Sequence, residues 1–346
     1  MEKISKKLFN NKTILITGGT GSFGQSFLKY LLTNFRSFRK IIIFSRDEFK
    51  QHEMSIRFPV TKYPFLRYFL GDVRDRSRVE RTVEGVDFIV HAAALKQVPS
   101  AEYNPFEAIK TNVIGAQNIV EAALNAKVKK VIALSTDKAV VPLNLYGATK
   151  LCSDKLFLSA NNIKGSRDLI FSVVRYGNVM GSRGSVIPKF LSQKKEGLIT
   201  VTHKKMTRFN ILMEKCVQSV AWSLQNCVGG EIIVPKAPSY HLLDLIKAIA
   251  PNCKTKYIGI RTGEKLHEEL ITKSDSYNTY DLGEKYVILE NNNAMQNNFY
   301  LTKEKATKVK ENFSYDSYTN PKFLSVNELR TIIKKYTLSK NKFLFI

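Results

Sequence analysis

Two pairs of side chains in the stretch STDKAVVPLNLYGATK could do acid–base chemistry. Tyr146 and Lys150 are four residues apart, so on a helix they would lie on one face. An ammonium beside a phenol lowers its pKa, so Tyr146 could take a proton from an alcohol while a hydride leaves for a nicotinamide. Just upstream, Thr136 precedes Asp137 and Lys138. Two interpretations of Lys138 are open here: a solvated loop charge, or a base that removes a proton from carbon.

A glycine-rich turn indicates where a dinucleotide would bind. In TILITGGTGSFGQSFLKYLL, Gly18, Gly21 and Gly24 have the spacing G-x-x-G-x-x-G. Such glycines permit a tight turn and let a pyrophosphate approach the N-terminus of a helix. A glycine triplet alone is a weak signal, but its place between a predicted strand and a predicted helix makes it specific. The cofactor contacts predicted in this turn are Gly18, Thr20, Gly21, Ser22, Phe23 and Gly24.

The end of the second predicted strand bears on the choice between NADP and NAD. Arg46 lies 22 residues after Gly24, where an acidic residue would bind a ribose hydroxyl and an Arg would accommodate a 2′-phosphate. Asp47 follows it directly, so the signal is mixed, and Arg46 could also be a surface residue at a helix start. We predict NADP, with NAD as the less favoured cofactor, because Ser45, Arg46 and Lys50 could surround a phosphate. Further predicted cofactor contacts at strand ends are Asp72, Val73, Ala92, Ala93 and Ala94.

Short β-branched runs alternate with helical patterns from residue 12 to about 175. This alternation predicts an α/β fold, a Rossmann-like doubly wound parallel sheet with helices on both faces. A helix is predicted over residues 104–124, with Asn104 as its cap and Phe106 on its apolar face. The predicted strands are residues 12–17, 39–44, 65–70, 86–91, 129–135 and 169–175.

The pattern becomes less regular beyond residue 180, where Gly- and Pro-rich connections join short strands. We therefore expect an NADP-binding Rossmann domain over residues 1–180, to which a segment near residues 206–235 returns. Residues 181–346 are expected to form a smaller α+β substrate lobe that ends in a tail.

Composition and charge argue against several classes of protein. The longest apolar runs of the 346 residues are far shorter than the roughly 18 residues of a membrane-spanning helix. The 4 Cys and 5 His show no metal-ligand spacing, so we expect no metal site and free thiols of the kind found in a reducing cytoplasm. The net charge of +24 suggests nucleic acid, but the Lys residues are spread over the chain and no nucleic-acid-binding motif accompanies them. We predict a cytoplasmic protein with neither a membrane nor a nucleic acid as partner.

Several motifs, taken in order, resemble the extended short-chain dehydrogenase/reductase family, whose members act on nucleotide-linked sugars. They are TGGTGSFG, the HAAA turn, the Ser-Thr at the end of the fifth predicted strand, and YGATK. Within that family, residues from about 12 to 290 resemble the inverting UDP-N-acetylglucosamine 4,6-dehydratases of the pseudaminic acid pathway. The segments that carry this resemblance are FSRDEFKQHEM, AAALKQVPSAEYNP, STDKAVVPLNLYGATKLCSDKLF, RYGNVMGSRGSV, MTRF and RTGEKLHE.

The resemblance implies a hydro-lyase reaction on UDP-N-acetylglucosamine. Tyr146, helped by Lys150, would take the sugar O4 proton as hydride passes from C4 to NADP, and the 4-keto group would acidify the C5 proton. Lys138, which stands where retaining dehydratases carry Glu, would be the base at C5, and Asp137 the acid for the departing hydroxyl. Hydride would then return to C6 and a proton to the opposite face of C5. The product would be UDP-2-acetamido-2,6-dideoxy-beta-L-arabino-hex-4-ulose.

The resemblance also implies how the substrate is held. Lys96, Asn178 and Val179 would contact it, and Arg208 and Arg261 would grip the UDP diphosphate, a task suited to fork-shaped donors. Without the resemblance, each of these could be a surface or structural residue. A homo-oligomer, either a hexamer or a dimer, is likewise implied.

Four alternatives follow from the same residues. A capsule-type inverting dehydratase usually carries Met where this chain has Tyr146, and the pair Asp137-Lys138 argues against a nucleotide-sugar epimerase or a retaining dehydratase. A protein of another class, an NADP-binding regulatory scaffold, would not need the intact set of Asp137, Lys138, Tyr146 and Lys150.

Overall fold

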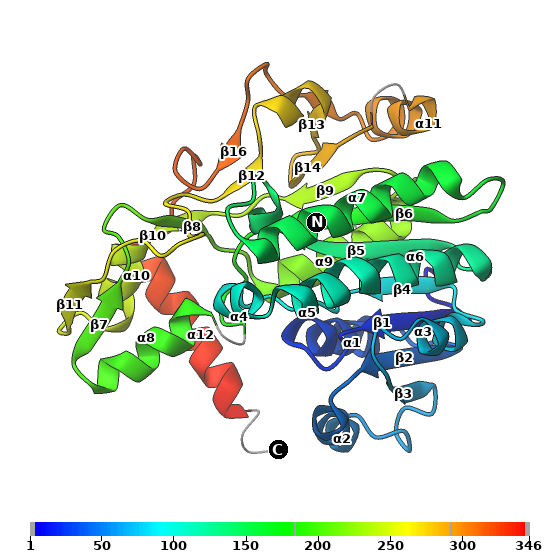
Figure 1. Cartoon of the computed structure of the whole chain (residues 1–346), viewed down its shortest axis with the longest axis horizontal. Coiled ribbons are helices and arrows are strands. Elements are labelled where there is room, and N and C mark those ends of the chain that lie inside the picture. Colours follow the sequence, from blue (N-terminus) through cyan, green and yellow to red (C-terminus); the bar gives the residue numbers. More distant parts are fainter. Residues whose placement is uncertain (1–3, 183–184, 291–292, 343–346) are drawn as a thin grey trace.

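The computed structural model describes residues 4–182, 185–290 and 293–342, so the last residues of the predicted tail, 343–346, lie outside it. Within these residues the largest sheet has ten strands (Figure 1). From one edge to the other they are β3 (Leu66–Leu70), β2 (Lys40–Ser45), β1 (Thr13–Thr17), β4 (Phe88–His91), β5 (Lys130–Thr136), β6 (Ile170–Tyr176), β9 (Ile232–Pro235), β14 (Lys285–Ile288), β13 (Thr279–Asp281) and β15 (Thr307–Lys308).

The strands from β3 to β9 run parallel, and the last three are antiparallel to their neighbours. All five residues of β1 are buried, as expected for a parallel strand whose two faces are both covered. Each of the six predicted strands coincides with an observed one to within two residues at either end. The predicted fold class, an α/β doubly wound sheet, is confirmed.

Helices cover both faces of the sheet (Figure 1). Ile14 and Ile16 of β1 pack in the core cluster under α1 (Ser22–Asn34) and α9 (Met213–Asn226), whereas Leu15 packs in the cluster on the opposite face. That second face is covered by α3 (Arg76–Val83), α6 (Gly115–Asn125) and α7 (Leu145–Ile163). In the part of the chain described, no helix combines the length and the apolar character needed to cross a membrane.

The single helix predicted over residues 104–124 is wrong in detail. The structure divides it into α5 (Pro105–Ile109), a π-helical turn (Lys110–Ile114) and α6. Asn104 donates to the Ser100 carbonyl instead of capping the helix, and Phe106 is 62% exposed, so neither residue has its predicted role.

The π-helical turn places the buried side chain of Asn112 against two other elements. Its Oδ1 accepts from the Leu95 amide at 2.8 Å, and its Nδ2 donates to the Leu95 carbonyl at 2.9 Å and to Thr149 Oγ1 at 3.0 Å. Such bulges often re-aim a side chain near a functional site. Here the bulge ties the exit of β4 to helix α7.

A separate hydrophobic cluster forms the lobe beside the sheet (Figure 1). It is built from α8 (Val186–Lys195), β7 (Leu198–Val201), α10 (Leu242–Ile249) and α12 (Val326–Lys342), and β11 (Lys254–Tyr257) pairs with β7. The lobe is joined to the sheet by the short pairs β8 (Thr207–Phe209) with β10 (Ser239–His241) and β12 (Glu269–Ile271) with β16 (Tyr315–Asp316). The domain boundary near residue 180 stays a prediction. Helix α9 and strand β9 lie in the segment that was expected to return to the main sheet. The later strands β13, β14 and β15 also extend that sheet.

A short 3-10 turn (Asp137–Ala139) follows β5 and lies against the first turn of α7. Asn144 caps α7, accepting from the amide of Gly147 at 2.8 Å. A Cβ atom at Gly147 would overlap the backbone carbonyl of Lys138. Glycine is therefore required at this position, because no side chain fits between the helix and the turn.

Replacing Gly147 by Ala is expected to destabilise the protein by about 1–3 kcal/mol, the usual cost of overpacking. Helix propensity alone predicts the opposite, since Ala is favoured over Gly inside a helix by about 1 kcal/mol. Urea unfolding of the wild type and of Gly147→Ala measures the difference. An equal or higher free energy of unfolding in the variant would show that the turn is not held against the helix.

Candidate active site

A cleft of about 1030 Å³ lies at the carboxyl ends of the parallel strands and is lined by residues of both the sheet and the lobe. Open α/β sheets bind ligands at this edge, where the strand order reverses between β1 and β4. Every site residue predicted from the sequence lines this cleft except Asp72. The structure thus brings the predicted cofactor, catalytic and substrate residues together in one cleft.

The glycine-rich turn after β1 is packed too closely to accept side chains. Gly18 has a φ of +63°, and a Cβ atom there would lie 2.8 Å from the amide nitrogen of Ala93. A Cβ atom at Gly24 would overlap the backbone of Gly19. Gly19 did not figure in the predicted spacing, although the adjacent glycines in TGGTG could have indicated it. The turn brings bare backbone to the N-terminus of α1, where a pyrophosphate could be held.

Charged residues at the ends of β2 and β3 already have partners in the protein. Asp47 caps α2 (Glu48–Arg57) by accepting from the Lys50 amide at 2.9 Å, and its carboxylate also pairs with Lys50 Nζ. Asp72 lies behind the cleft wall, where Arg74 Nη2 at 2.7 Å and Arg46 Nη1 at 3.7 Å contact its Oδ2. Asp47, Arg46 and Lys50 nevertheless all line the cleft, so the predicted contacts of these residues with a cofactor remain predictions.

Tyr146 and Lys150 lie on the first turns of α7, and both are buried. Burial raises the pKa of Tyr146 to about 12, opposed by the charge of Lys138 and a hydrogen bond with Thr136. The predicted lowering of this pKa is therefore wrong in this structure, because burial decides its direction and the charge that opposes burial comes from Lys138. Burial lowers the pKa of Lys150, while Asp154 opposes that shift, and Lys150 Nζ donates to Ser153 Oγ at 3.4 Å.

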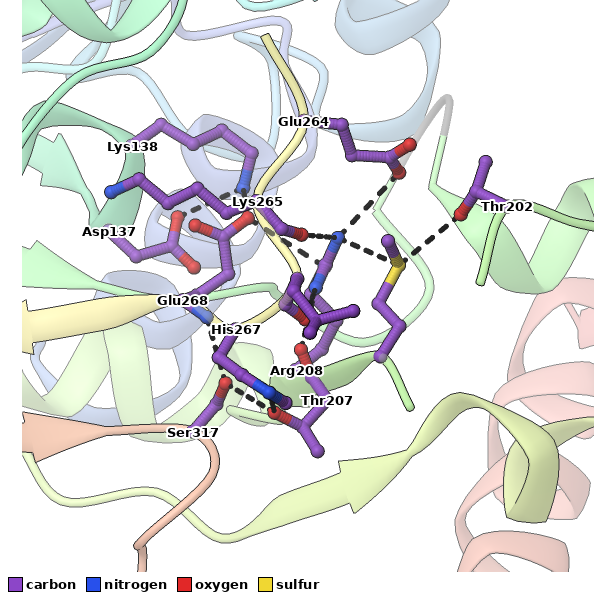
Figure 2. Close-up of polar contacts among 12 residues, drawn as sticks. Asp137, Lys138, Thr202, Thr207, Arg208, Glu264, Lys265, His267, Glu268 and Ser317 are labelled. Carbon is purple, nitrogen blue, oxygen red and sulfur yellow. Dashed lines mark hydrogen bonds and ion pairs between the residues drawn. The ribbon is translucent and has the colours of Figure 1, made fainter. Parts of the chain in front are cut away.

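The side chain of Lys138 lies between two buried carboxylates (Figure 2). Its Nζ is 3.0 Å from Asp137 Oδ1 and 3.1 Å from Glu268 Oε1. Burial alone would lower the pKa of Lys138, but the two carboxylates outweigh it and raise the pKa above its usual value. The interpretation of Lys138 as a solvated loop charge is therefore wrong, and a base at this position must first lose a tightly held proton.

Asp137 is the more deeply buried neighbour of Lys138. Its side chain is 1% exposed, and its Oδ1 accepts from Thr136 Oγ1 at 3.0 Å. Its Oδ2 has no hydrogen-bond partner among the residues described. Burial raises its pKa, against the opposing charge of Lys138. A carboxyl group in this environment is suited to hold a proton and donate it.

The guanidinium of Arg208 is committed to groups of the protein (Figure 2). It is buried and donates to three backbone carbonyls, those of Thr207 at 2.7 Å and of Lys265 and Leu266 at 3.0 Å. Its Nε also lies 3.7 Å from Glu268 Oε1. The predicted grip of Arg208 on a diphosphate remains a prediction, and Arg261 lines the same cleft from an exposed turn.

Two site residues escaped the sequence analysis. Gly177 follows β6, and a Cβ atom there would clash with Phe209 Cβ at 2.6 Å and lie 3.3 Å from Asp137 Oδ2, so glycine lets Phe209 pack here beside that carboxylate. Glu268 lies in the segment RTGEKLHE, which was singled out for Arg261 alone. Glu264, Lys265 and His267 precede it and Glu269 follows it, so no local signal distinguishes this carboxylate from its charged neighbours.

Comparison with known proteins agrees with this geometry. A family model described as "Polysaccharide biosynthesis protein" matches residues 14–290. A Campylobacter jejuni protein named UDP-N-acetylglucosamine 4,6-dehydratase (inverting) is 52% identical over 94% of this chain and 98% of its own length. A Rickettsia canadensis UDP-glucose 4-epimerase is 39% identical over 94% and 96%. The X-ray structure of Pen from Bacillus thuringiensis has a TM-score of 0.87 at 38% identity, covering 95% of this chain and 99% of that one. The chain therefore belongs to this polysaccharide biosynthesis family, with the fold of an extended short-chain dehydrogenase/reductase.

Proposed function

We propose that the protein is a UDP-N-acetylglucosamine 4,6-dehydratase that inverts C5, the first step of pseudaminic acid biosynthesis. The observation that carries the proposal is the Asp137-Lys138 pair, held in the cleft within reach of Tyr146 and Thr136. Oxidation of an alcohol needs only the Tyr and its Lys, whereas elimination also needs an acid and a base. The relative from Campylobacter jejuni, whose name states this activity, supports the same conclusion.

The nicotinamide cofactor would be held by the glycine turn and the ends of β2 and β4. When bound, it supplies reversible acceptance of a hydride. We propose NADP rather than NAD, because Ser45, Arg46 and Lys50 line the end of the cleft where a 2′-phosphate would lie. Asp47, the residue that could favour NAD, is engaged as a helix cap.

The residues of the cleft divide into those for oxidation and those for elimination. Tyr146, oriented by its hydrogen bond with Thr136, would take the O4 proton from the sugar. Lys150 would supply the nearby positive charge that favours the phenolate. Asp137, whose burial favours the protonated form, would protonate the departing C6 hydroxyl, and Lys138 as a free amine would remove the C5 proton.

The UDP-sugar would be contacted by four further residues that line the same cleft: Lys96, Asn178, Val179 and Arg261. Burial and the charge of Lys138 both lower the pKa of Lys96. We further expect a homo-oligomer and a cytoplasmic location.

A nucleotide-sugar 4-epimerase is the second candidate, because several relatives of 39–40% identity are named UDP-glucose 4-epimerase. An epimerase would oxidise and re-reduce C4 with Tyr146 and Lys150 but would leave C6 untouched. The buried Asp137-Lys138 pair then has no task, and for this reason we favour the dehydratase.

Incubation of the purified protein with UDP-N-acetylglucosamine in D₂O, without added cofactor, is expected to give a 4-keto-6-deoxy sugar with deuterium at an inverted C5. The deuterium enters because the C5 proton is removed and replaced from solvent. Proton NMR follows the product. A C4 epimer as the sole product would favour the epimerase, and unchanged substrate would exclude both.

Lys138→Ala is expected to bind the nucleotide sugar and cofactor normally but to form product about 100-fold more slowly, the scale of a lost general base. C4 oxidation should persist, so reduced nicotinamide should accumulate and can be followed by its near-ultraviolet absorbance. Lys127→Ala, on an exposed position after α6, is the matched control. Normal turnover by the Lys138 variant would contradict its role as base.

Arg46→Ala is expected to weaken NADP binding about 10-fold while leaving NAD binding within about 2-fold, because it removes one charge-assisted contact to a phosphate. Titration of the cofactor-free protein by calorimetry measures both dissociation constants. An equal loss for both cofactors would show that Arg46 is only a surface residue at the start of α2.

A further inference from the structure

Glu268 is a buried carboxylate on the cleft wall that has no task in the reaction as proposed. It is 2% exposed, and its Oε1 lies 3.1 Å from Lys138 Nζ and 3.7 Å from Arg208 Nε. Its Oε2 is buried and has no hydrogen-bond partner among the residues that the structure describes. The negative charge of a carboxylate buried so deeply needs nearby cations to neutralise it. Such a residue is rare in protein interiors, which suggests that it has a specific role.

The backbone of Glu268 is fixed from both sides by Ser317 (Figure 2). The Glu268 amide donates to Ser317 Oγ at 2.9 Å, and the Ser317 amide donates to the Glu268 carbonyl at 2.7 Å. Ser317 Oγ is in turn 2.8 Å from Thr207 Oγ1, which lies 2.7 Å from Nδ1 of His267. These hydrogen bonds fix the backbone of Glu268 in the position from which its side chain contacts Lys138.

The charges around Lys138 distinguish its two carboxylate neighbours. Burial raises the pKa of Asp137, which favours its protonated form. Burial acts in the same direction on Glu268, but Lys138 and Arg208 outweigh it and lower its pKa. Glu268 is therefore the neighbour that stays ionised and has an oxygen open to a proton, but its lowered pKa keeps that proton on Lys138 until the ion pair is weakened. The other titratable or charged groups that face this cluster are Lys96, Tyr146, Arg208, Tyr240, Glu264 and Lys265.

We propose that Glu268 is a positioning residue that acts through Lys138. Its carboxylate holds the Lys138 ammonium in the cleft and accepts the proton that Lys138 must release before it can act as a base. The inference rests on the dehydratase function proposed above. It supplies the one element that function lacked, a route by which a charged Lys138 becomes a free amine at neutral pH.

The proton transfers balance. One N–H bond of the Lys138 ammonium breaks and one O–H bond forms on Glu268, so that an ion pair becomes an amine and a carboxylic acid. The amine takes the C5 proton, the C5–H electrons form the C5–C6 double bond, and the hydroxyl leaves C6 with its bonding electrons and the proton of Asp137, as water. Glu268 then returns its proton through Lys138 to Asp137, which restores the starting state.

A bound substrate favours this transfer. The Lys138 side chain is 23% exposed, and a sugar in the cleft would remove the water around it. Loss of water penalises the ammonium and the carboxylate more than the neutral amine and acid, so the balance moves toward the neutral pair. Elimination would then begin only when the substrate is in place.

The test compares Glu268→Gln with the wild type from pH 6 to 10, in approximate steps of one unit, measuring product formation by NMR and C4 oxidation by the absorbance of reduced nicotinamide. The wild type should show a flat rate around neutral pH, because the proton moves within the site. Glu268→Gln should oxidise C4 normally, eliminate about 100-fold more slowly at pH 7, and gain about 10-fold per pH unit, since Lys138 must then lose its proton to solvent. Glu269→Gln, the same change one residue away and outside the cleft, should behave as the wild type.

Each other outcome overturns the proposal. A rate that is lower but equally flat with pH would mean a structural role, a faster rate at pH 7 would mean that Glu268 is only a counter-ion, and a wild-type profile would mean no role. Glu268→Asp, which withdraws the carboxylate by one methylene, gives a second test: elimination should slow while C4 oxidation persists, and unchanged elimination would contradict the relay. If the wild type itself makes no 4-keto-6-deoxy sugar, the proposed function fails instead.

Discussion

The positive charge of Lys138 is the constraint on which the candidate site depends. An ammonium withdrawn from water needs anions close by, and here Asp137 and Glu268 supply them from two neighbouring segments beside the cleft. One of these carboxylates comes with the sheet and the other with the lobe. The contact therefore joins the two parts of the molecule at the place where the chemistry is proposed. The same two carboxylates raise the pKa of Lys138, so the residue proposed as a base carries a proton in the resting site.

The fold meets this constraint by close packing and by long-range hydrogen bonds. Asp137 and Lys138 follow directly from a buried strand, and Gly147 lets the next helix press against their backbone. Gly177 lets Phe209 pack beside the carboxylate of Asp137. The guanidinium of Arg208 donates to the carbonyls of Lys265 and Leu266 and so fixes the segment that leads to Glu268. Together, these contacts fix the positions of the Asp137 and Glu268 carboxylates around the Lys138 ammonium.

Much of this arrangement was predictable because its signals are local. The six strands that were predicted are short β-branched or apolar runs, and the glycine turn has its characteristic spacing within a few residues. The parts that escaped prediction depend on contacts between distant segments. The π-helical turn lets Asn112 form hydrogen bonds with Leu95 and Thr149, and no local sequence pattern predicts this turn. The pKa of Tyr146 was predicted from its neighbour Lys150, whereas burial, which a sequence does not display, decides it.

The hydrogen bonds between Ser317 and Glu268 have a consequence for how the chain evolves. The family model ends at residue 290, so Ser317, which supports this carboxylate, lies beyond that model but within the 94% of the chain that a relative matches. The segment around Ser317 is then coupled to a residue within the family model, and changes in one must be accommodated by the other. Chimeras that exchange tails between relatives would inherit the catalytic motifs and still alter the acid–base balance of the cleft.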